Sequence, residues 1–366
     1  MRVYLFFSLF LLFFFALHYL FYSRVIKKLL VSEQVKKIFT LLLSLNFIFN
    51  LLYVAGRYTD IISNTFYYLF SLSIGITFVL LLYLILHEIL HLFHKSLTSI
   101  DHSKRAFIKK SGDATMFALA TSYVSAGAYE GHKEPVVNIV EFNHFDFSIV
   151  QISDLHIGGL IDKDFIKASV LKINALKPDI VFITGDLVDT SLKYIEDTVR
   201  ELDSISSKYG VYYILGNHEY FHDPLKIIDF IKTTQMKLLL NENVTIDALK
   251  LNVVGVTDRI GYRMNLLEPD IHKAFKGCNK NYKTILLAHQ PKFIEELGIY
   301  TPELILSGHT HGGQIWPFEY LVRLQQPYVK GLHQLSNGSH IYVNSGIGFW
   351  GPPMRLDSQA EIAFIV

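Results

Sequence analysis

The stretch LILSGHTHGG, residues 304–313, joins a short apolar run to two histidines and two glycines. The run LILS is typical of a buried β-strand, and the glycine-rich residues after it favour a loop. His309 and His311 are two residues apart, so in extended backbone their side chains point the same way. The pattern predicts a strand that carries two imidazole rings to one place. A site there would need further polar side chains from other segments of the chain.

Four further predicted strands also end at a polar side chain. The runs FSIVQIS, DIVFITG, GVYYILG and TILLA lead into Asp154, Asp186, Asn217 and His289. Helical stretches alternate with these runs, which predicts an α/β fold, and open α/β sheets carry their sites at the carboxyl ends of strands. Taken singly, each aspartate is compatible with a helix cap and Asn217 with a turn. Five such ends in one chain favour a shared metal site.

The polar blocks at these strand ends resemble the motifs of a known superfamily. The series DLH, GD, GNHE, AH and GHTH resembles the calcineurin-like metallophosphoesterases, whose motifs D-x-H, G-D, G-N-H-[ED], H and G-H-x-H follow one another in this order. The resemblance covers about residues 136–366. The segments NALKPDIVFITGDLVD and SGIGFWGPPMR are similar to the membrane-anchored bacterial branch, which includes phosphodiesterases and enzymes similar to UDP-2,3-diacylglucosamine pyrophosphatases. The resemblance implies a four-layer sandwich of two mixed sheets flanked by helices.

The resemblance also implies a centre of two divalent metal ions. One ion would be held by Asp154, His156, Asp186 and His311, and the other by Asp186, Asn217, His289 and His309. Asp186 would bridge the ions, because a carboxylate has two oxygens. His218 would contact the phosphate and protonate the leaving group, which makes His218 and Asp186 the implied catalytic residues. Mixed carboxylate and imidazole ligands favour Mn²⁺, with Fe or Zn²⁺ as alternatives.

Further residues are predicted to support this centre or to bind substrate. Asp189 and Glu219 are candidates for orienting the ligands, with ordinary surface polarity as the alternative. Arg355 and Arg323 are candidates for gripping a second phosphate, because a guanidinium binds phosphate oxygens in bidentate fashion. The aromatic segments QIWPFEYLVRLQQPY and FWGPP are suited to an acyl-chain groove or a membrane interface, or else to ordinary core packing.

The N-terminal part has the composition of a membrane domain. Hydrophobic residues make up 51% of the chain, and its mean hydropathy is +0.30. The apolar stretches 3–22, 38–56 and 66–86 are each long enough to cross a bilayer. Residues 1–112 hold 12 Lys+Arg and 4 Asp+Glu, whereas the remainder holds 22 and 29. We therefore predict a membrane domain over residues 1–130 and a catalytic domain over 136–366, with no nucleic-acid partner for the acidic part.

The side of the membrane that carries the catalytic domain depends on a fourth apolar stretch. The basic residues lie between the first two spans and after the third, which places those joints in the cytoplasm. If residues 114–129 also span, the catalytic domain is outside; if they lie on the surface, it is cytoplasmic. The preceding SKRAFIK resembles a twin-arginine export signal with Lys104 in place of the first arginine. We expect an extracytoplasmic domain on a bacterial inner membrane.

A second histidine motif lies in the third apolar stretch. HEILH, residues 87–91, matches the H-E-x-x-H pattern of zinc proteases, in which both histidines share a helix face. A zinc site would need another ligand, and the other predicted spans contain no Asp or Glu. We interpret the motif as an interfacial helix end, with a non-catalytic contact to a metal or a lipid headgroup as an alternative to the protease.

Together these patterns predict a membrane-anchored hydrolase of a phosphodiester or pyrophosphate on a lipid-linked small substrate. The lipid bilayer and that substrate are its expected partners. The alternatives are a non-catalytic membrane protein that uses a metal-bound domain for binding, and an intramembrane HExxH protease.

Overall fold

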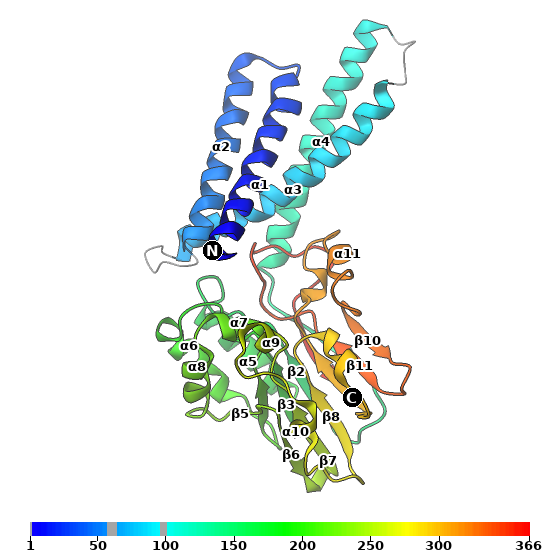
Figure 1. Ribbon diagram of the computed structural model, residues 1–366. Coiled ribbons are helices and arrows are strands. Elements are labelled where there is room, and N and C mark those ends of the chain that lie inside the picture. Colours follow the sequence, from blue (N-terminus) through cyan, green and yellow to red (C-terminus); the bar gives the residue numbers. More distant parts are fainter. Residues whose placement is uncertain (1, 57–63, 96–100) are drawn as a thin grey trace. The chain divides into compact units, whose positions relative to one another are not determined.

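The computed structural model describes residues 2–56, 64–95 and 101–366, which form two compact units. Unit 1 comprises residues 1–129 with Gly351–Met354, and unit 2 comprises Glu130–Trp350 with Arg355–Val366. Figure 1 colours the helices of unit 1 blue to cyan and most of unit 2 green to red. The change from helical to α/β structure falls between Gly131, where helix α4 ends, and Val136, where strand β1 begins.

Unit 1 is built from four long helices. They are α1 (Arg2–Arg24), α2 (Glu33–Gly56), α3 (Asn64–Lys95) and α4 (His102–Gly131). Three described segments are long and apolar enough to cross a membrane, namely Ser8–Lys28, Glu33–Gly56 and Phe66–Leu92. They overlap the three predicted spans. The fourth apolar stretch and SKRAFIK both lie within α4, which is not among those segments, so its crossing stays a prediction.

Buried polar side chains connect the first three helices of unit 1. The Asn46 side-chain amide donates to Thr77 Oγ1 at 2.7 Å and lies 3.1 Å from His18 Nε2. Asn50 also donates to Thr77 Oγ1, at 2.7 Å. Interhelical hydrogen bonds between such side chains are a usual way to hold apolar helices together in a membrane, where hydrophobic burial distinguishes poorly between helix and lipid.

Unit 2 contains two six-stranded mixed sheets. The first has the order β1-β12-β2-β3-β4-β5 and the second β10-β11-β9-β8-β7-β6. The strands of the first are β1 (Val136–Val140), β2 (Ile149–Ile152), β3 (Ile180–Thr184), β4 (Val211–Ile214), β5 (Lys237–Leu238) and β12 (Glu361–Ile365). Those of the second are β6 (Glu242–Ile246), β7 (Leu251–Gly255), β8 (Lys283–Leu287), β9 (Leu304–Ser307), β10 (Gly331–Gln334) and β11 (His340–Val343). In each sheet the central strands run parallel.

Apolar clusters on the sheet faces arrange unit 2 in four layers. One cluster joins the two sheets, with Phe182 and Tyr212 from the first and Leu287 from the second. A second packs helices α5 (Lys163–Ala175) and α8 (Pro224–Ile231) on the first sheet. A third packs α10 (Ile271–Phe275) on the second sheet. Helix α5 begins at an N-cap, Asp162, whose side chain accepts the Phe165 N–H. The predicted sandwich of two mixed sheets flanked by helices is confirmed.

The strands end where their sequences change from apolar to polar. Strand β3, IVFIT, is buried along its whole length, as a parallel strand covered on both faces must be. The next polar ligand candidates come two residues after the ends of β2, β3, β8 and β9, and three residues after β4. Because these strands are parallel neighbours within each sheet, their carboxyl ends bring the five loops to one edge of the sandwich.

Candidate metal centre

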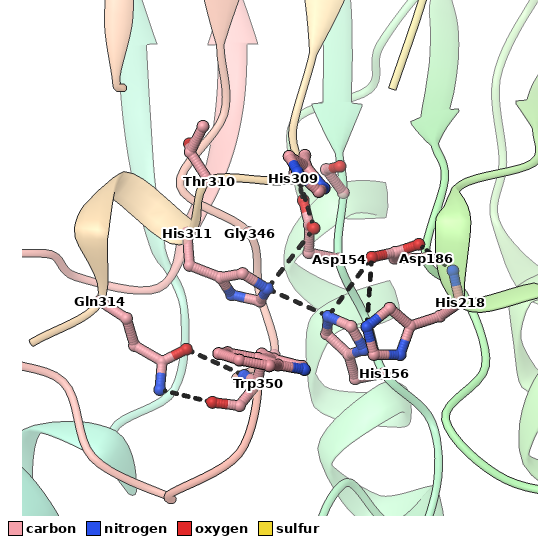
Figure 2. A network of polar contacts seen from close by, with 12 residues as sticks. Asp154, His156, Asp186, His218, His309, Thr310, His311, Gln314, Gly346 and Trp350 are labelled. Carbon is pink, nitrogen blue, oxygen red and sulfur yellow. Dashed lines mark hydrogen bonds and ion pairs between the residues drawn. The ribbon is translucent and has the colours of Figure 1, made fainter. Parts of the chain in front are cut away.

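The predicted ligands gather in two adjoining groups. Asp154, His156 and His311 form one group, and Asp186, His289 and His309 form the other, each with ligand atoms within 4.8 Å of one another. Figure 2 shows the side chains of Asp154, His156, Asp186 and His311 converging from separate loops. Within the part of the chain that the structure describes, the carboxylate of Asp186 is the link between the groups: its Oδ2 lies 3.8 Å from His156 Nε2 and 3.2 Å from His289 Nε2.

The separations between the ligand atoms fit cation binding. The Nε2 atoms of His156 and His311 are 3.0 Å apart, and His311 Nε2 is 3.5 Å from Asp154 Oδ1. Two nitrogens that are each about 2.1 Å from one metal ion, at a right angle, lie about 3.0 Å apart. In the second group the Oδ1 atom of Asn217 lies 3.1 Å from His289 Nε2. The donor set of carboxylate, imidazole and amide oxygen therefore suits two transition-metal ions.

The backbone at these ligands has an uncommon conformation. Five of the seven predicted ligands have a positive φ, between 48° and 69°: Asp154, His156, Asp186, His309 and His311. A non-glycine residue in this region costs about 1 kcal/mol or more, and such residues cluster at functional sites. Close backbone approach at neighbouring glycines accompanies this strain. A Cβ atom on Gly308 would lie 2.3 Å from Asp154 Oδ2, and one on Gly216 would lie 2.2 Å from Asp186 Oδ1.

Glu219 holds the loops of Asp186 and Asn217 together. Its buried carboxylate accepts backbone N–H groups from Gly216 at 2.6 Å, Asp186 at 3.1 Å, Leu187 at 2.7 Å and Val188 at 3.1 Å. Burial, and then the negative charge of Asp186, raise the pKa of Glu219 to about 7. One side chain thus fixes the loop after β3 against the start of helix α7 (Asn217–Phe221).

Burial and neighbouring charges shift the pKa values of the histidine ligands in different directions. Burial lowers the pKa of His309 to about 3 and that of His311 well below its ordinary value, which keeps both imidazoles neutral. Burial alone would lower the pKa of His289, but the charge and hydrogen bond of Asp186, together with the charges of Asp154 and Asp258, raise that pKa well above normal. A positive charge is therefore favoured beside Asp186. Metal binding would supply it and release the proton, since a histidine ligand must be neutral.

Hydrogen bonds select the ring nitrogens that face the centre. His289 Nδ1 lies 2.8 Å from the carbonyl oxygen of Thr184, which can only accept, so Nδ1 carries the proton and Nε2 is left for a ligand role. His309 N–H donates to both oxygens of Asp154, at 3.0 and 2.9 Å. The His289 loop is therefore bonded to the end of β3, and the His309 loop to Asp154 in the loop after β2.

His218 lies beside the ligands with a carboxylate behind it. Its Nδ1 lies 2.7 Å from Asp189 Oδ1, and its Nε2 lies 3.9 Å from Asp186 Oδ2. The carboxylate accepts the Nδ1 proton and leaves Nε2 on the side of the centre. The ring also packs edge-on against His156, with 4.5 Å between centroids. This is the arrangement expected of a proton donor to a leaving group, with Asp189 as the residue that orients it.

The two predicted phosphate-binding arginines lie in different environments. Arg355 is buried, and its Nη2 donates to the carbonyl oxygens of Ser345 at 2.9 Å, Gly346 at 3.0 Å and Gly348. Its Nη1 lies within hydrogen-bond distance of Ser358 and Gln359. Arg323 is exposed at the end of α11 (Glu319–Val322). The structure gives Arg355 a role in holding the loop after β11, and phosphate binding by either arginine stays a prediction.

One buried carboxylate near the centre, Asp258, was not predicted from the sequence. Asp258 follows β7 by three residues, and its two oxygens accept the Gln290 side-chain amide at 2.9 and 3.1 Å. Gln290 directly follows His289 in the chain. The signal that could have revealed Asp258 was the same as for the others, an apolar strand followed at once by a carboxylate.

The HEILH motif of α3 shows no comparable convergence. His87 and His91 stack with 6.3 Å between ring centroids, and His87 Nδ1 lies 3.7 Å from Glu88 Oε1. Among the residues that the structure describes, these side chains belong to no group of three potential ligands. The side chain of His94, which follows the motif on the same helix, lies outside the described residues.

Comparison with known proteins places this centre among metallophosphoesterases. The family profile described as calcineurin-like phosphoesterase matches residues 147–313. An uncharacterized metallophosphoesterase of Campylobacter jejuni is 32% identical over 99% of this chain and 98% of its own length. A Helicobacter pylori metallophosphoesterase is 37% identical over 81% and 82%, respectively. A transmembrane protein with metallophosphoesterase domain from Bos taurus is 31% identical over 74% of this chain and 65% of its own.

Proposed function

The chain belongs to the calcineurin-like phosphoesterase family, and on this premise we propose that it is a membrane-anchored, dinuclear-metal hydrolase of a lipid-linked phosphodiester or pyrophosphate. One observation carries the chemical part of the proposal. Asp186 Oδ2 lies within 3.8 Å of a nitrogen from each ligand group, so one carboxylate can serve two ions. Two ions that share a carboxylate form the kind of site that cleaves phosphoesters.

The ions would supply the nucleophile and neutralise phosphate charge. Bound to Asp154, His156, Asp186, Asn217, His289, His309 and His311, they would lower the pKa of a bound water towards about 7. We propose Mn²⁺ as the native ion, with Fe or Zn²⁺ as alternatives, because the ligands mix carboxylates with neutral imidazoles.

The chain's own proton donor would be His218. With Asp189 holding Nδ1, His218 Nε2 is directed to the centre, where it would protonate the departing oxygen. We expect His218→Ala to lower kcat by about 10²- to 10⁴-fold and Asp189→Asn by about 10- to 100-fold, with the metal content unchanged in both. Metal analysis beside steady-state kinetics checks this. Loss of metal from His218→Ala would instead make His218 a ligand.

The membrane attachment supports a lipid-linked substrate. Three candidate spans tether the chain to a bilayer, so a substrate dissolved in the same bilayer would reach the enzyme by diffusion in two dimensions. Trp316 and Tyr320 are exposed on unit 2, and these residue types favour the membrane interface. We propose a bacterial inner-membrane location with the catalytic domain outside, which an alkaline phosphatase fusion at the C-terminus tests. An inactive fusion would place the domain in the cytoplasm.

A paired assay on detergent-purified, Mn²⁺-loaded protein tests the reaction. One arm contains an aryl phosphodiester and the other UDP-2,3-diacylglucosamine, each with Asn217→Ala as the matched inactive control. Release of UMP that the variant abolishes would identify a pyrophosphatase of that cytoplasmic substrate and overturn the extracytoplasmic orientation. Turnover of the aryl diester alone would keep phosphodiester chemistry. No turnover in either arm, with two metals bound, would support the non-catalytic alternative.

A further inference from the structure

Trp350 is a half-exposed aromatic residue that the protein holds firmly beside the metal centre. Trp350 is 46% exposed, so it lacks much of the hydrophobic burial that usually stabilises a tryptophan side chain. Its backbone is bonded at both polar atoms to a single side chain: Trp350 N–H donates to Gln314 Oε1 at 2.9 Å, and Gln314 Nε2 donates to Trp350 O at 3.0 Å. We call this pair of bonds the Gln314 clamp.

The Gln314 clamp ties Trp350 to the loop that carries His311. Gln314 is three residues beyond His311, is buried, and has a φ of 51°, which is positive like that of His311. Its own backbone continues the connection, because Gln314 N–H donates to His311 O at 2.9 Å. The position of Trp350 is therefore set by the same loop that sets the His311 imidazole.

The other end of the Trp350 segment is fixed to the loop of Asp154. Ile347 N–H donates to Ser153 O at 3.0 Å, and Gly348 N–H donates to Asp154 O at 2.9 Å. A Cβ on Gly348 would lie 2.3 Å from Leu155 O, so the two backbones are in direct contact. Trp350, two residues later, is thus anchored from two sides to the ligands of one metal group.

The indole points into the side of the centre that this group occupies. Figure 2 shows the ring of Trp350 directed toward His156 and His311 and away from the Gln314 amide. An exposed, rigid aromatic surface next to a phosphate-binding site offers contact area to whatever group is attached to the phosphate, at low cost in side-chain entropy. The two-point backbone clamp leaves that surface little freedom to turn away.

We propose that Trp350 is the specificity-determining residue of this enzyme, and that its indole packs against an acyl or alkyl chain of the substrate beside the reacting phosphate. This inference rests on the proposed phosphodiester hydrolysis. An aliphatic chain is the matching chemistry because three candidate spans tether the protein to a bilayer, whose lipids carry such chains.

The test compares ethyl p-nitrophenyl phosphate with octyl p-nitrophenyl phosphate on full-length, Mn²⁺-loaded protein. Both esters release p-nitrophenolate at the same phosphorus, so their kcat/KM ratio reports contact with the alkyl chain alone. We expect the wild-type protein to favour the octyl ester by about tenfold or more, mainly through KM, because burying methylenes is favourable. Trp350→Ala should bring that ratio close to one, and Trp350→Phe should restore part of it.

Trp316→Ala is the matched control, since Trp316 is 47% exposed and lies outside the Gln314 clamp. An equal fall in the ratio for Trp316→Ala would show a general loss of surface aromatics and overturn the assignment to Trp350. A ratio that Trp350→Ala leaves unchanged, with both esters still hydrolysed, would also overturn it and leave the proposed function standing. Failure of the wild-type protein to hydrolyse either ester would break the proposed phosphodiester hydrolysis and, with it, this assignment.

Discussion

The chain carries two paired histidine motifs, GHTH in a loop of unit 2 and HEILH on helix α3 of unit 1. In HEILH the spacing of four residues stacks His87 and His91 on one helix face, and His87 Nδ1 lies 3.7 Å from Glu88 Oε1, but among the described residues these side chains join no group of three potential ligands. In GHTH the two histidines go to different ligand groups, and each meets side chains from other strand ends. Two imidazoles at a suitable spacing do not make a metal site; convergence of several chain segments does.

The two motifs also differ in backbone conformation. Helix α3 gives its histidines the ordinary helical geometry, whereas His309 and His311 have φ values of 69° and 50°. Left-handed backbone at non-glycine residues persists only where the surroundings enforce it. At GHTH the surroundings do so through the bonds of His309 N–H to Asp154. Strain at the loop and its absence at the helix therefore separate a built site from a coincidence of sequence.

The largest expected effect is that of replacing Asp186, the carboxylate between the two ligand groups. Asp186→Asn should lower kcat by about a thousandfold or more and reduce bound metal below two ions per chain, because an amide offers only one oxygen between the two groups. Glu88→Gln, the matching change in HEILH, should leave both quantities within about twofold. Metal analysis and aryl diester hydrolysis measure them. The opposite ranking would overturn the assignment of the metal centre to unit 2.

A second comparison, between the two arginines, should give a smaller effect on stability. Arg355→Met removes a buried guanidinium and leaves the carbonyls of Ser345, Gly346 and Gly348 without their donor, so the free energy of unfolding should fall by about 3 kcal/mol. Arg323→Ala, at an exposed helix end, should change it by less than about 0.5 kcal/mol. Denaturant unfolding of both variants provides the measurement. A stable Arg355→Met protein with a raised KM would instead support a phosphate-binding role for Arg355.

The smallest expected effect is a pH dependence at Asp258. Burial raises the pKa of Asp258 to about 6 from an ordinary value of 3.8, so the folded protein holds this proton more tightly than the unfolded chain. Its contribution to stability is therefore lost as the pH rises from about 4 to 6. In metal-free protein, the free energy of unfolding of Asp258→Asn should rise relative to that of the wild type over that pH range. The difference should reach on the order of 2 kcal/mol above pH 6. Parallel melting curves from pH 4 to 7 would show that Asp258 keeps an ordinary pKa.

The strand ends could be predicted from sequence because their signal is local. Each apolar run stops within three residues of Asp154, Asp186, Asn217, His289 or His309, and parallel strands bring such ends to one edge. The structure places these residues there. Asp258 carries the same local signal and was overlooked because no motif drew attention to it.

Other features depend on contacts that no local pattern contains. An arginine after GPPM could bind phosphate or could donate to backbone carbonyls in the interior. Only the carbonyls around Arg355 distinguish these two roles. The Gln314 clamp joins residues 36 positions apart. Composition identified three long apolar helices, but it could not show that Asn46 and Thr77 would meet between them.

The four N–H groups that donate to Glu219 have a consequence for how the protein binds its metal ions. Because these bonds join the Asp186 loop to the start of α7 without using a ligand atom, we expect these loops to keep their positions without metal. Loading then requires no rearrangement of the chain, only the exchange of protons for cations. A protein stripped by a chelator should regain its function on simple readdition of metal, without a refolding lag.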